Sequence, residues 1–347
     1  MVAKKNAVTL KGNPWWSLSY ALISLKNYPV RNMGIALVLA IGIALPTTVF
    51  VWTTTGTNLA VNEYFREESY QMALIPKAGE FSNLLDAQAT ALGSDYIDCA
   101  HLVPSSIGIL TGDFFDGWFQ YSMFDMNYRK EIKDMRVIIT TNEILANWSR
   151  DFTWRGNFSL SLGQVLVSER FVDYAHEVHN ITIDIGTTID IDLLRYGAPK
   201  DQFGTPTSLG QYPVEDLMVV GVYEIKNLGS ILGASFPSIT RLNWDPMALE
   251  RDTVLGITDS VIILDDEVGA EVVDEVAGGG FFAPVVLLRP SESGLLRDGA
   301  QNIGTNLATL KIQLEEQYPD VAVDGLSEIW KLESFITTYL QSQILTI

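Results

Sequence analysis

The sequence is poor in the residues that build disulfide-rich domains, cysteine-based metal sites and histidine-based catalytic centres. Among 347 residues there is one cysteine, Cys99, and there are three histidines. A single cysteine excludes an internal disulfide framework and any CxxC-type zinc or redox site. Three histidines leave little material for a histidine-based catalytic centre. The chain is therefore neither a disulfide-stapled module nor a cysteine-rich zinc protein.

Basic residues are also scarce. The sequence has 23 Lys and Arg against 42 Asp and Glu, which gives a net charge of −19. Phosphate binding needs a basic face, so this balance argues against nucleic acid as a partner. Hydrophobic residues make up 47% of the chain and charged residues 19%, which excludes disorder as its general state. The length allows one large domain or two modest ones.

Charge is distributed very unevenly along the chain. Residues 1–32 carry five basic residues and no acidic one, for a charge of +5. No charged residue occurs in residues 33–62, and everything from Glu63 onward carries 18 basic and 42 acidic residues, a charge of −24. A basic head, a neutral middle and an acidic body form the layout of a membrane-anchored protein.

The neutral middle predicts a transmembrane helix over residues 33–52. These twenty uncharged residues would extend about 30 Å as a helix, the thickness of a bilayer's hydrocarbon core. Pro46 would kink a soluble helix but is tolerated where neighbouring helices satisfy the freed carbonyl. Small residues provide surfaces for close packing against other membrane helices; they are Gly34, Ala36, Ala40, Gly42 and Ala44.

Two other interpretations of this stretch are a buried helix of a soluble protein and a cleaved signal peptide. The uncharged run is too long for a buried core helix, and the charges of its two flanks are too asymmetric. A signal peptide has a short charged head and an apolar region of about 7–15 residues. Here the head is 32 residues long and has a pattern of its own. An uncleaved anchor is the prediction.

The head is expected to form an amphipathic elbow helix on the inner membrane surface. Apolar residues including Trp15 and Trp16 recur at helical spacing, with Lys11 and Lys26 at the ends. Tryptophan favours the headgroup layer. Lysine and arginine, including Lys26 and Arg31, concentrate on the cytoplasmic side of membranes. The head is therefore expected inside the cell and the acidic body outside, at the plasma membrane.

The acidic body is expected to be an α+β domain with two subdomains, because strands and helices are interleaved without a strict βαβ repeat. The predicted boundaries are 56–326 for this extracytoplasmic domain, with an inserted lobe at about 110–215. Residues 327–347 are expected to be a stalk or the start of a second membrane helix.

Hydrophobic periodicity predicts individual elements within this body. Helices are expected at 80–93, 142–148, 169–175 with Ser168 as cap, 265–277, and in one continuous stripe from Leu296 to Tyr318. Strands are expected at 136–140, 165–168, 217–224, 261–264 and 284–288. Residues 181–185 and 189–193 alternate apolar with polar residues on either side of Gly186, which predicts a β-pair.

No catalytic motif is visible, and no cofactor is implied. The sequence lacks a GxxxxGK[ST] phosphate loop, a GxSxG elbow and an HExxH motif. Asp173, His176 and His179 could offer a metal one helical face, although a solvated helix end explains them more simply. Acidic residues at 265–267 are expected to cap a helix. Asp190 and Asp192 are expected on the solvent face of a strand. The chain is expected not to be an enzyme.

Three N-glycosylation sequons occur on the side predicted to be outside, at Asn147, Asn157 and Asn180. Asparagine, serine and threonine are common enough here that about two such sites would arise by chance, so they carry little weight. Cys99 is most simply a small buried hydrophobic residue.

In its layout the chain resembles the MacB/FtsX-like family of ABC-transporter permease subunits. Four stretches carry the likeness: the basic elbow and small-residue helix from Ser19 to Ala44, Gln164–Phe171 followed by Ile185–Ile191, the Met218–Tyr223 strand with Val219-Val220-Gly221-Val222, and the late helix ending at Leu314–Val321. Each motif alone is degenerate, and their order along the chain carries the resemblance.

The resemblance implies a permease subunit that works as a dimer with two cytoplasmic ATPases and couples their motion to the outer domain. The implied partners are the lipid bilayer, an ABC ATPase, and further permease helices or a second copy. Family members have four membrane helices, whereas this sequence offers one clear candidate and an uncharged stretch at 334–347. The alternative function is a single-pass, membrane-anchored binding or adhesion protein, with an anchored extracellular enzyme as a third possibility.

Overall fold

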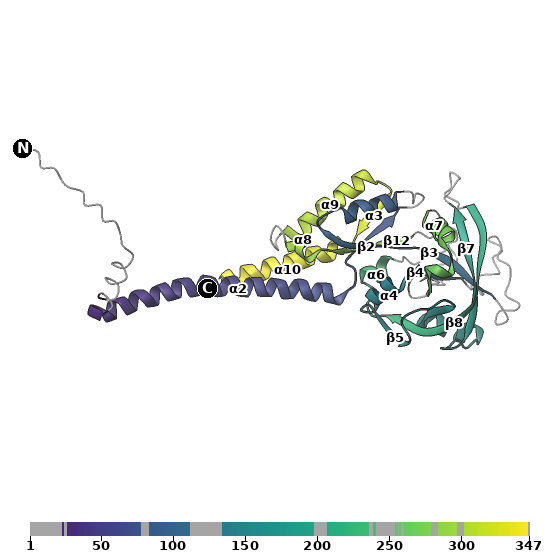
Figure 1. Ribbon diagram of the computed structural model, residues 1–347, viewed down its shortest axis with the longest axis horizontal. Helices are drawn as coiled ribbons and strands as arrows, with labels where there is room; N and C mark the ends of the chain where they lie inside the picture. The colour runs from purple at the N-terminus through teal and green to yellow at the C-terminus, as the bar shows by residue number, and fades with distance from the viewer. Residues whose placement is uncertain are drawn as a thin grey trace, which may run out of the picture. The chain divides into compact units, whose positions relative to one another are not determined.

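The computed structural model describes residues 23, 26–77, 83–111, 134–197, 207–235, 239–240, 254–255, 257, 260–278, 284–296 and 302–345. The fold is mixed α/β, and its elements are labelled in Figure 1. The chain divides into two compact units, Met1–Asn58 with Tyr339–Ile347 and Leu59–Thr338. Helices α2 (Pro29–Glu67) and α10 (Leu326–Leu345) each continue from one unit into the other.

Helix α2 contains the whole predicted apolar span and is longer than expected. It is a single helix of 39 residues that runs beyond Trp52 to Glu67. Pro46 lies inside it without ending it, and the Thr47 hydroxyl donates to the Ile43 carbonyl at 2.7 Å. By length and composition, this helix is able to cross a membrane. The expected domain boundary at residue 56 therefore falls inside a continuous helix.

A four-stranded antiparallel sheet is built from the two ends of the larger unit. Its order is β13 (Val321–Asp324), β1 (Met72–Pro76), β12 (Val285–Pro290) and β2 (Ile97–Val103). Helices α3 (Leu84–Leu92) and α9 (Ile303–Gln317) contact these strands, and α8 (Glu292–Leu296) contacts α9.

The middle of the chain forms a seven-stranded sheet that closes on itself. Its order is β5 (Phe152–Gly156), β8 (Thr207–Ile225), β6 (Gln164–Ser168), β11 (Ser260–Leu264), β4 (Asp134–Thr140), β3 (Ser105–Thr111) and β7 (Thr188–Gly197). Strand β8 is long enough to pair with β7 along its first part and with β6 and β5 along its second. These pairings join six strands into a barrel-like ring.

Alternating side chains give the ring two apolar faces. Val137 and Ile139 belong to a core shared with α5 (Glu169–His179) and α7 (Ala270–Gly278). Ile138 belongs to a second core, which also contains residues of β1, β12, α4 (Asn142–Trp148) and α6 (Ile231–Ser235). The second core includes the fully buried Trp148 and therefore packs the ring against the four-stranded sheet.

Several local predictions are confirmed. Helix α4 has the expected bounds, Asn142–Trp148. The Ser168 hydroxyl accepts a hydrogen bond from the Phe171 amide at 3.2 Å and caps α5 as predicted. The expected strands at 136–140, 165–168, 261–264 and 284–288 match observed strands with small differences at their ends, whereas the one expected at 217–224 is the second part of β8, which begins ten residues earlier at Thr207.

The predicted β-pair across Gly186 is wrong. Residues 181–185 form no strand, and β7 pairs with β3 and β8 instead. Gly186 has φ +94° and donates its amide to Val219 at 2.7 Å, while the Thr187 amide donates to Asp184 at 2.9 Å. A tight turn anchored to β8 thus replaces a hairpin. Ile183 is buried and Ile181 packs against the same core partly buried, whereas Ile185 is exposed.

One predicted helix is interrupted, and another is described in part. Residues 265–277 form a 3₁₀ turn, Asp265–Glu267, and then α7, because Gly269 between them has φ +71°. Of the predicted stripe from Leu296 to Tyr318, Leu296 is the last residue of α8 and Ile303–Gln317 form α9. Ala300, in the predicted stripe, lies outside the described residues. A short pair, β9 (Ile239–Thr240) with β10 (Val254–Leu255), completes the described elements.

The middle sheet occupies more of the sequence than the expected inserted lobe. Residue 110 lies inside β3 and residue 215 inside β8, and the strands of the ring extend from Ser105 to Leu264. The expected stretch at 327–347 corresponds to helix α10. Ile329, Leu332 and Ile336 of α10 are buried, whereas Trp330 and Phe335 are exposed.

Candidate functional site: the junction between helix α2 and the domain

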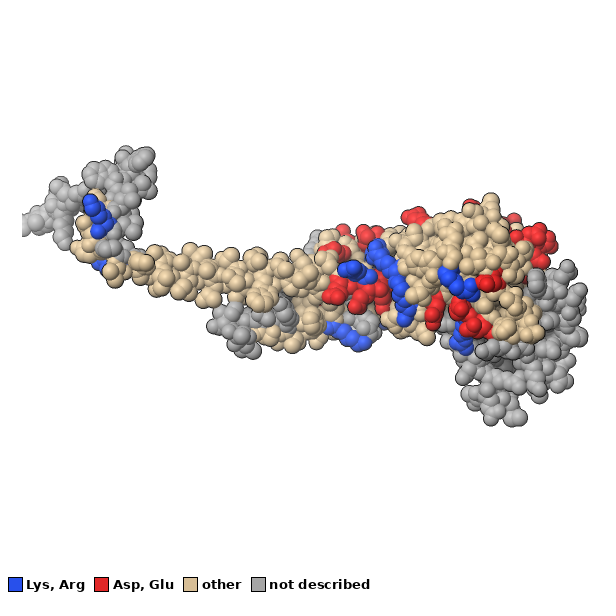
Figure 2. Space-filling view, turned by 90° about the horizontal axis from the view of Figure 1, so that it is seen from below, with Lys and Arg blue, Asp and Glu red and all other residues tan. Residues whose placement is uncertain are grey.

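The first half of α2 exposes its apolar side chains all around the helix. Val30, Met33, Val38 and Phe50 are each 69–85% exposed. Residues 33–62 of this helix carry no Lys, Arg, Asp or Glu, and this stretch is tan in Figure 2 between basic residues at its start and mixed charges further along. An apolar surface of this size requires another apolar environment.

The small residues predicted for helix packing are available for contact. A Cβ added at Gly34 or Gly42 would meet no heavy atom within 4 Å. Ala36, Ala40 and Ala44 recur every fourth residue on another side of the helix, which is the spacing of one helical face. Close approach of a second helix is therefore sterically open along α2.

Of the predicted interfacial residues, Lys26 and Arg31 lie within the described part of the chain, and both are exposed. The Arg31 guanidinium lies over the Tyr28 ring, 4.7 Å from its centroid, in a cation–π contact. Trp15 and Trp16 lie outside the described residues.

Four residues join α2 to the first strand, and three of them are almost completely buried. Ser69, Tyr70 and Gln71 have 0–1% of their surface exposed. We call the segment Glu68–Gln71 the junction. A flexible tether would leave such residues in water, so their burial shows that the chain enters the domain along a fixed path.

Ser69 is hydrogen-bonded on all sides by residues distant in sequence. Its amide donates to both carboxylate oxygens of Asp151 at 3.3 and 3.4 Å, and its hydroxyl donates to the Asn147 carbonyl. Its own carbonyl accepts from Arg289 Nε at 3.0 Å. Asn147 lies in the last turn of α4, Asp151 lies between α4 and β5, and Arg289 belongs to β12, so the junction is bonded to the α4–β5 segment and to the four-stranded sheet.

The neighbouring residues extend these contacts. Arg150 Nη1 donates to the Phe65 carbonyl at 3.3 Å, which satisfies one of the terminal carbonyls of α2. Glu68 accepts from the Ile231 amide at 3.4 Å, at the start of α6. Gln71 Nε2 donates back to the Glu68 carbonyl at 2.8 Å. Displacement of the end of α2 would therefore strain several elements together.

Helix α10 begins beside the junction. Ala73 of β1 pairs with Asp324 of β13, so the start of β1 and the end of β13 are neighbours. Gly325 follows with φ +97°, and a Cβ there would overlap the Gln71 carbonyl and lie 2.9 Å from the Met72 Cα. Glycine lets the two backbones approach at the point where α2 ends and α10 starts.

Burial raises the pKa of Asp151, and the hydrogen bonds from Ser69 and the charges of Lys226 and Arg150 oppose this increase. An acid whose pKa is higher in the folded than in the unfolded chain destabilises the fold as pH rises above its unfolded pKa of about 3.9. Ionisation of the Asp151 carboxylate therefore lowers the stability of the fold at neutral pH, while the carboxylate provides the hydrogen-bond acceptor for the Ser69 amide.

We expect Asp151→Asn to raise the unfolding midpoint progressively, relative to wild type, as pH increases from about 4 to 7, because the variant cannot ionise. Asp151→Ala is expected to cost about 1–3 kcal/mol, since the buried Ser69 amide loses its acceptor. Thermal unfolding of the detergent-solubilised full chain at several pH values measures both effects. A midpoint difference between Asp151→Asn and wild type that does not change with pH would contradict the raised pKa.

A second buried polar cluster lies within the ring. Arg136 Nη1 donates to Ser105 Oγ at 2.8 Å, and the Tyr223 hydroxyl bonds to Ser260. These residues lie on β4, β3, β8 and β11. Burial lowers the pKa of Arg136 to about 10. The cluster ties four strands together and is not identifiable from local sequence patterns.

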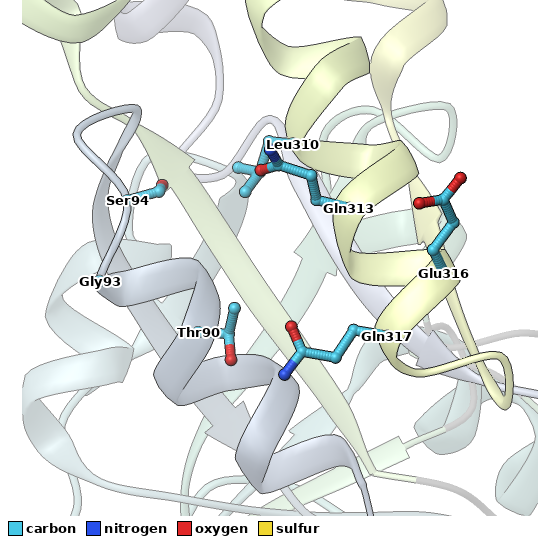
Figure 3. Close-up of a pocket in the computed structure, with 7 residues that line it drawn as sticks. All are labelled: Thr90, Gly93, Ser94, Leu310, Gln313, Glu316 and Gln317. Atoms are coloured by element: carbon cyan, nitrogen blue, oxygen red, sulfur yellow. The ribbon is translucent and has the colours of Figure 1, made fainter.

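A groove of about 640 Å³ lies between α3 and α9 (Figure 3). Its lining consists of Thr90, Gly93, Ser94, Leu310, Gln313, Glu316 and Gln317. The Thr90 hydroxyl bonds to the Tyr318 hydroxyl at 2.8 Å at its edge. Glu316 is the one ionisable side chain in this lining, so the groove does not offer the paired groups of acid–base catalysis.

The other residues considered as metal ligands or reactive groups do not form a site in the described part of the chain. Among the described residues, no three His, Cys, Asp or Glu side chains are placed to hold a metal ion. Asp190 is half-buried rather than on an open face, and it accepts the Asp216 amide at 2.7 Å. Cys99 is half-buried, and burial raises the pKa of its thiol.

The sequons differ in accessibility. Asn157 and Asn180 are exposed, whereas Asn147 is half-buried and precedes the fully buried Trp148. The junction itself was not predicted from the sequence. Its clearest local signal is the Asp324-Gly325 pair between a strand and a helix, a dipeptide typical of turns.

Comparisons with known proteins do not assign this chain to a family. No protein-family model matches the chain, and no curated protein matches it. Among solved structures, it has a low similarity to a domain of a protein from Porphyromonas gingivalis that is described as a permease. The two share 9% identity over 73% of this chain and 85% of that chain, with a TM-score of 0.29. A score this low supports no inference about function.

Proposed function

We propose that the chain is a membrane-anchored subunit, or part of one, of an ABC-type permease or mechanotransmission complex. In this role α2 crosses the membrane and couples a cytoplasmic ATPase to the α/β domain outside. The observation that carries the proposal is the junction, where a helix able to span a membrane enters the domain without a flexible linker.

Rigid attachment favours coupling over simple anchoring. A tethered binding or adhesion domain needs only a linker of sufficient reach. Here the residues after α2 are buried and bonded to α4, α6 and β12, so movement of the helix end would be transmitted to both sheets. Helix α10 starts next to the same place, directly after β13, which pairs with β1.

The charge distribution supports the orientation. Four of the five basic residues of 1–32 precede α2 and the fifth, Arg31, lies in its first turn, whereas the strongly acidic domain follows the helix. Basic segments remain on the cytoplasmic side of membranes, which supports a position of the domain outside. The implied partners are the bilayer, an ABC ATPase, and further permease helices or a second copy. The resemblance to the MacB/FtsX-like family agrees with this arrangement.

The proposal predicts that the tagged full chain, solubilised gently from its own membranes, is recovered with an ATPase that has a phosphate-binding loop. Gly34→Leu combined with Gly42→Leu should reduce that recovery about five- to thirty-fold, because the added side chains hold neighbouring helices apart. Quantitative mass spectrometry of the purified complex measures the ratio of ATPase to this chain.

Leu39→Phe is the matched control, because Leu39 is already large and 59% exposed on the same helix. It should leave the recovery unchanged. Repeated isolation of the chain alone, under conditions in which other membrane complexes stay intact, would favour the single-pass binding or adhesion protein instead.

A further inference from the structure

Strand β13 forms one edge of the four-stranded sheet. Among the described strands, it pairs with β1 on one side only. The free side of an edge strand presents backbone N–H and C=O groups that can pair with a strand of another molecule. The partners of these groups on β13 therefore bear on how copies of this protein can associate.

Two side chains of α9 occupy the free side of β13. Lys311 Nζ donates to the Val323 carbonyl at 3.1 Å, and the Val323 amide donates to Glu315 Oε1 at 3.1 Å. The two side chains also form an ion pair, with 3.6 Å between Nζ and Oε1. We call Lys311 and Glu315 the edge pair. It gives Val323 one donor and one acceptor, which are the groups that a residue of a neighbouring antiparallel strand would provide.

Val321 is the next residue that faces this edge, because alternate residues of an antiparallel strand direct their backbone groups to the same side. Its amide donates to the Tyr318 carbonyl at 3.0 Å, directly after the end of α9. Both outward-facing amides of this four-residue strand are therefore bonded within the domain. A short strand also offers little length for pairing with another molecule.

The edge pair lies in a partly buried position. Its side chains are 35% exposed at Lys311 and 29% exposed at Glu315, and Val323 is 3% exposed. Hydrogen bonds to charged groups are stronger than those between neutral groups. A strand from another molecule would have to replace both of these bonds before it could pair with Val323.

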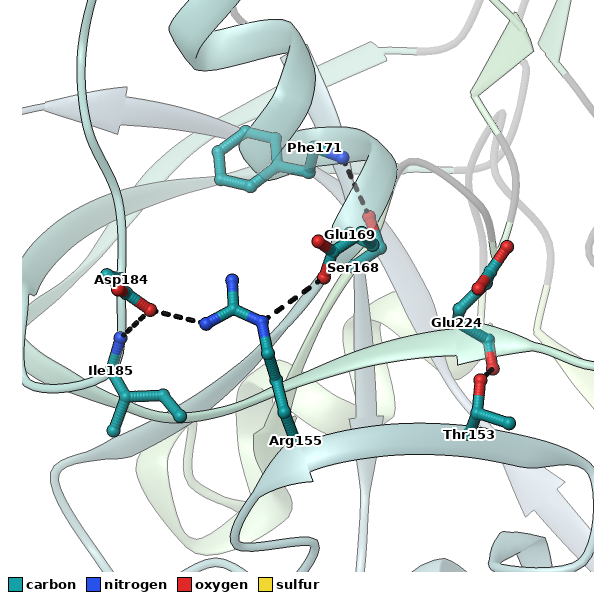
Figure 4. A network of polar contacts seen from close by, with 8 residues as sticks. All are labelled: Thr153, Arg155, Ser168, Glu169, Phe171, Asp184, Ile185 and Glu224. Carbon is teal, nitrogen blue, oxygen red and sulfur yellow. Dashed lines mark hydrogen bonds and ion pairs between the residues drawn. The ribbon is translucent and has the colours of Figure 1, made fainter.

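The ion pairs of Arg155 show what distinguishes the edge pair. Arg155 bonds to the side chains of Asp184 and Glu169 at the exposed surface (Figure 4). The main-chain bond of Asp184 is local, from the amide of the adjacent Ile185. Exposed ion pairs of this kind contribute little to stability. The edge pair instead bonds to the backbone of a strand that lies 8 and 12 residues further along the chain.

We propose that the edge pair prevents a second copy of this chain from adding its own β13 to this sheet. Two antiparallel β13 strands would extend the sheet across a twofold axis, with the same residues in contact on both copies. The edge pair competes with that contact, because the backbone of Val323 can bond either to α9 or to a second strand. The inference concerns the domain alone and does not depend on the proposed coupling through α2.

The test combines Lys311→Ala with Glu315→Ala in the detergent-solubilised full chain. Sedimentation equilibrium measures the average mass of this double variant and of wild type over the same range of concentrations. We expect the double variant to show an additional association step and to reach at least about twice the mass of wild type, because each freed edge can join another copy.

Ile312→Ala with Glu316→Ala is the matched control. These residues have the same spacing on α9, one position further along, and both are exposed. This variant should keep the mass of wild type. Glu315→Gln should keep it as well, because the amide oxygen of glutamine can still accept from the Val323 amide.

Hydrogen exchange of residues 321–324 locates the new contact. In dilute solution these amides should exchange faster in the double variant than in wild type, and association at higher concentration should slow their exchange again. The unfolding midpoint of each variant shows whether the domain is folded. If the double variant does not fold, Lys311→Ala alone replaces it, because this variant retains the bond to the Val323 amide, and a smaller gain in association is expected.

Three results would overturn the proposal. A folded variant with the mass of wild type at every concentration would show that the edge pair does not restrain association. Additional association that leaves the exchange of residues 321–324 unchanged would place the contact elsewhere. An equal gain in the matched control would show that any change on the surface of α9 promotes association.

Discussion

Gly325→Ala is expected to destabilise the domain by about 3–5 kcal/mol and to lower its unfolding midpoint by about 10 °C. The backbone at Gly325 has φ +97°, which strains any residue with a side chain. The added methyl group would also overlap the Gln71 carbonyl and press on Met72 and Ile231. Both costs fall on the junction, so the variant tests how tightly α2, β1 and α10 are held.

Gly210→Ala separates the cost of a strained backbone from the cost of overlap with neighbouring atoms. Gly210 has nearly the same φ, +103°, but a Cβ there would meet no heavy atom within 4 Å. This variant should lose only the backbone term, about 1–2 kcal/mol. Thermal or urea unfolding of the detergent-solubilised full chain measures both variants. Equal losses at the two positions would mean that the close approach at Gly325 contributes nothing.

Insertion of Gly-Ser-Gly-Ser between Glu67 and Glu68 is expected to abolish coupling while leaving the domain folded. The insertion leaves Ser69, Tyr70 and Gln71 in their buried positions but separates them from α2 by a flexible segment. Hydrogen exchange of the domain, measured in the purified complex with and without ATP, reports the coupling. We expect an ATP-dependent change in wild type and none in the insertion variant.

The same four residues added after Ile347 provide the control, and this variant should retain the ATP-dependent change. The unfolding midpoint of the insertion variant should stay close to that of wild type, because most junction bonds remain within the domain. An insertion variant with an undiminished ATP response would contradict coupling through α2 and would favour a simple anchor.

Sequence patterns predicted much of the local structure. Ser168 caps α5, and short continuous apolar runs mark β4, β6 and β11, because caps and local hydropathy act over a few residues. The same reasoning failed at Gly186, where alternation predicts a hairpin. There the competing hydrogen bond goes to Val219, on a strand far along the chain.

The junction shows why the candidate site was not predictable. Glu68–Gln71 is a polar segment after a helix, which locally resembles a surface linker. Its burial depends on Asp151, which lies 82 residues away, and on Arg289, which lies 220 residues away. Nothing in the local sequence marks such partners.

The sequence by itself determined the basic head, the uncharged span and the acidic body, because charge and hydropathy are properties of residues and not of their contacts. The tertiary structure alone decided that the strands close into a ring, that α2 continues to Glu67 into a buried junction, and that Gly325 must lack a side chain. These features arise from contacts between distant segments, and long-range packing overrides what a short stretch of sequence favours.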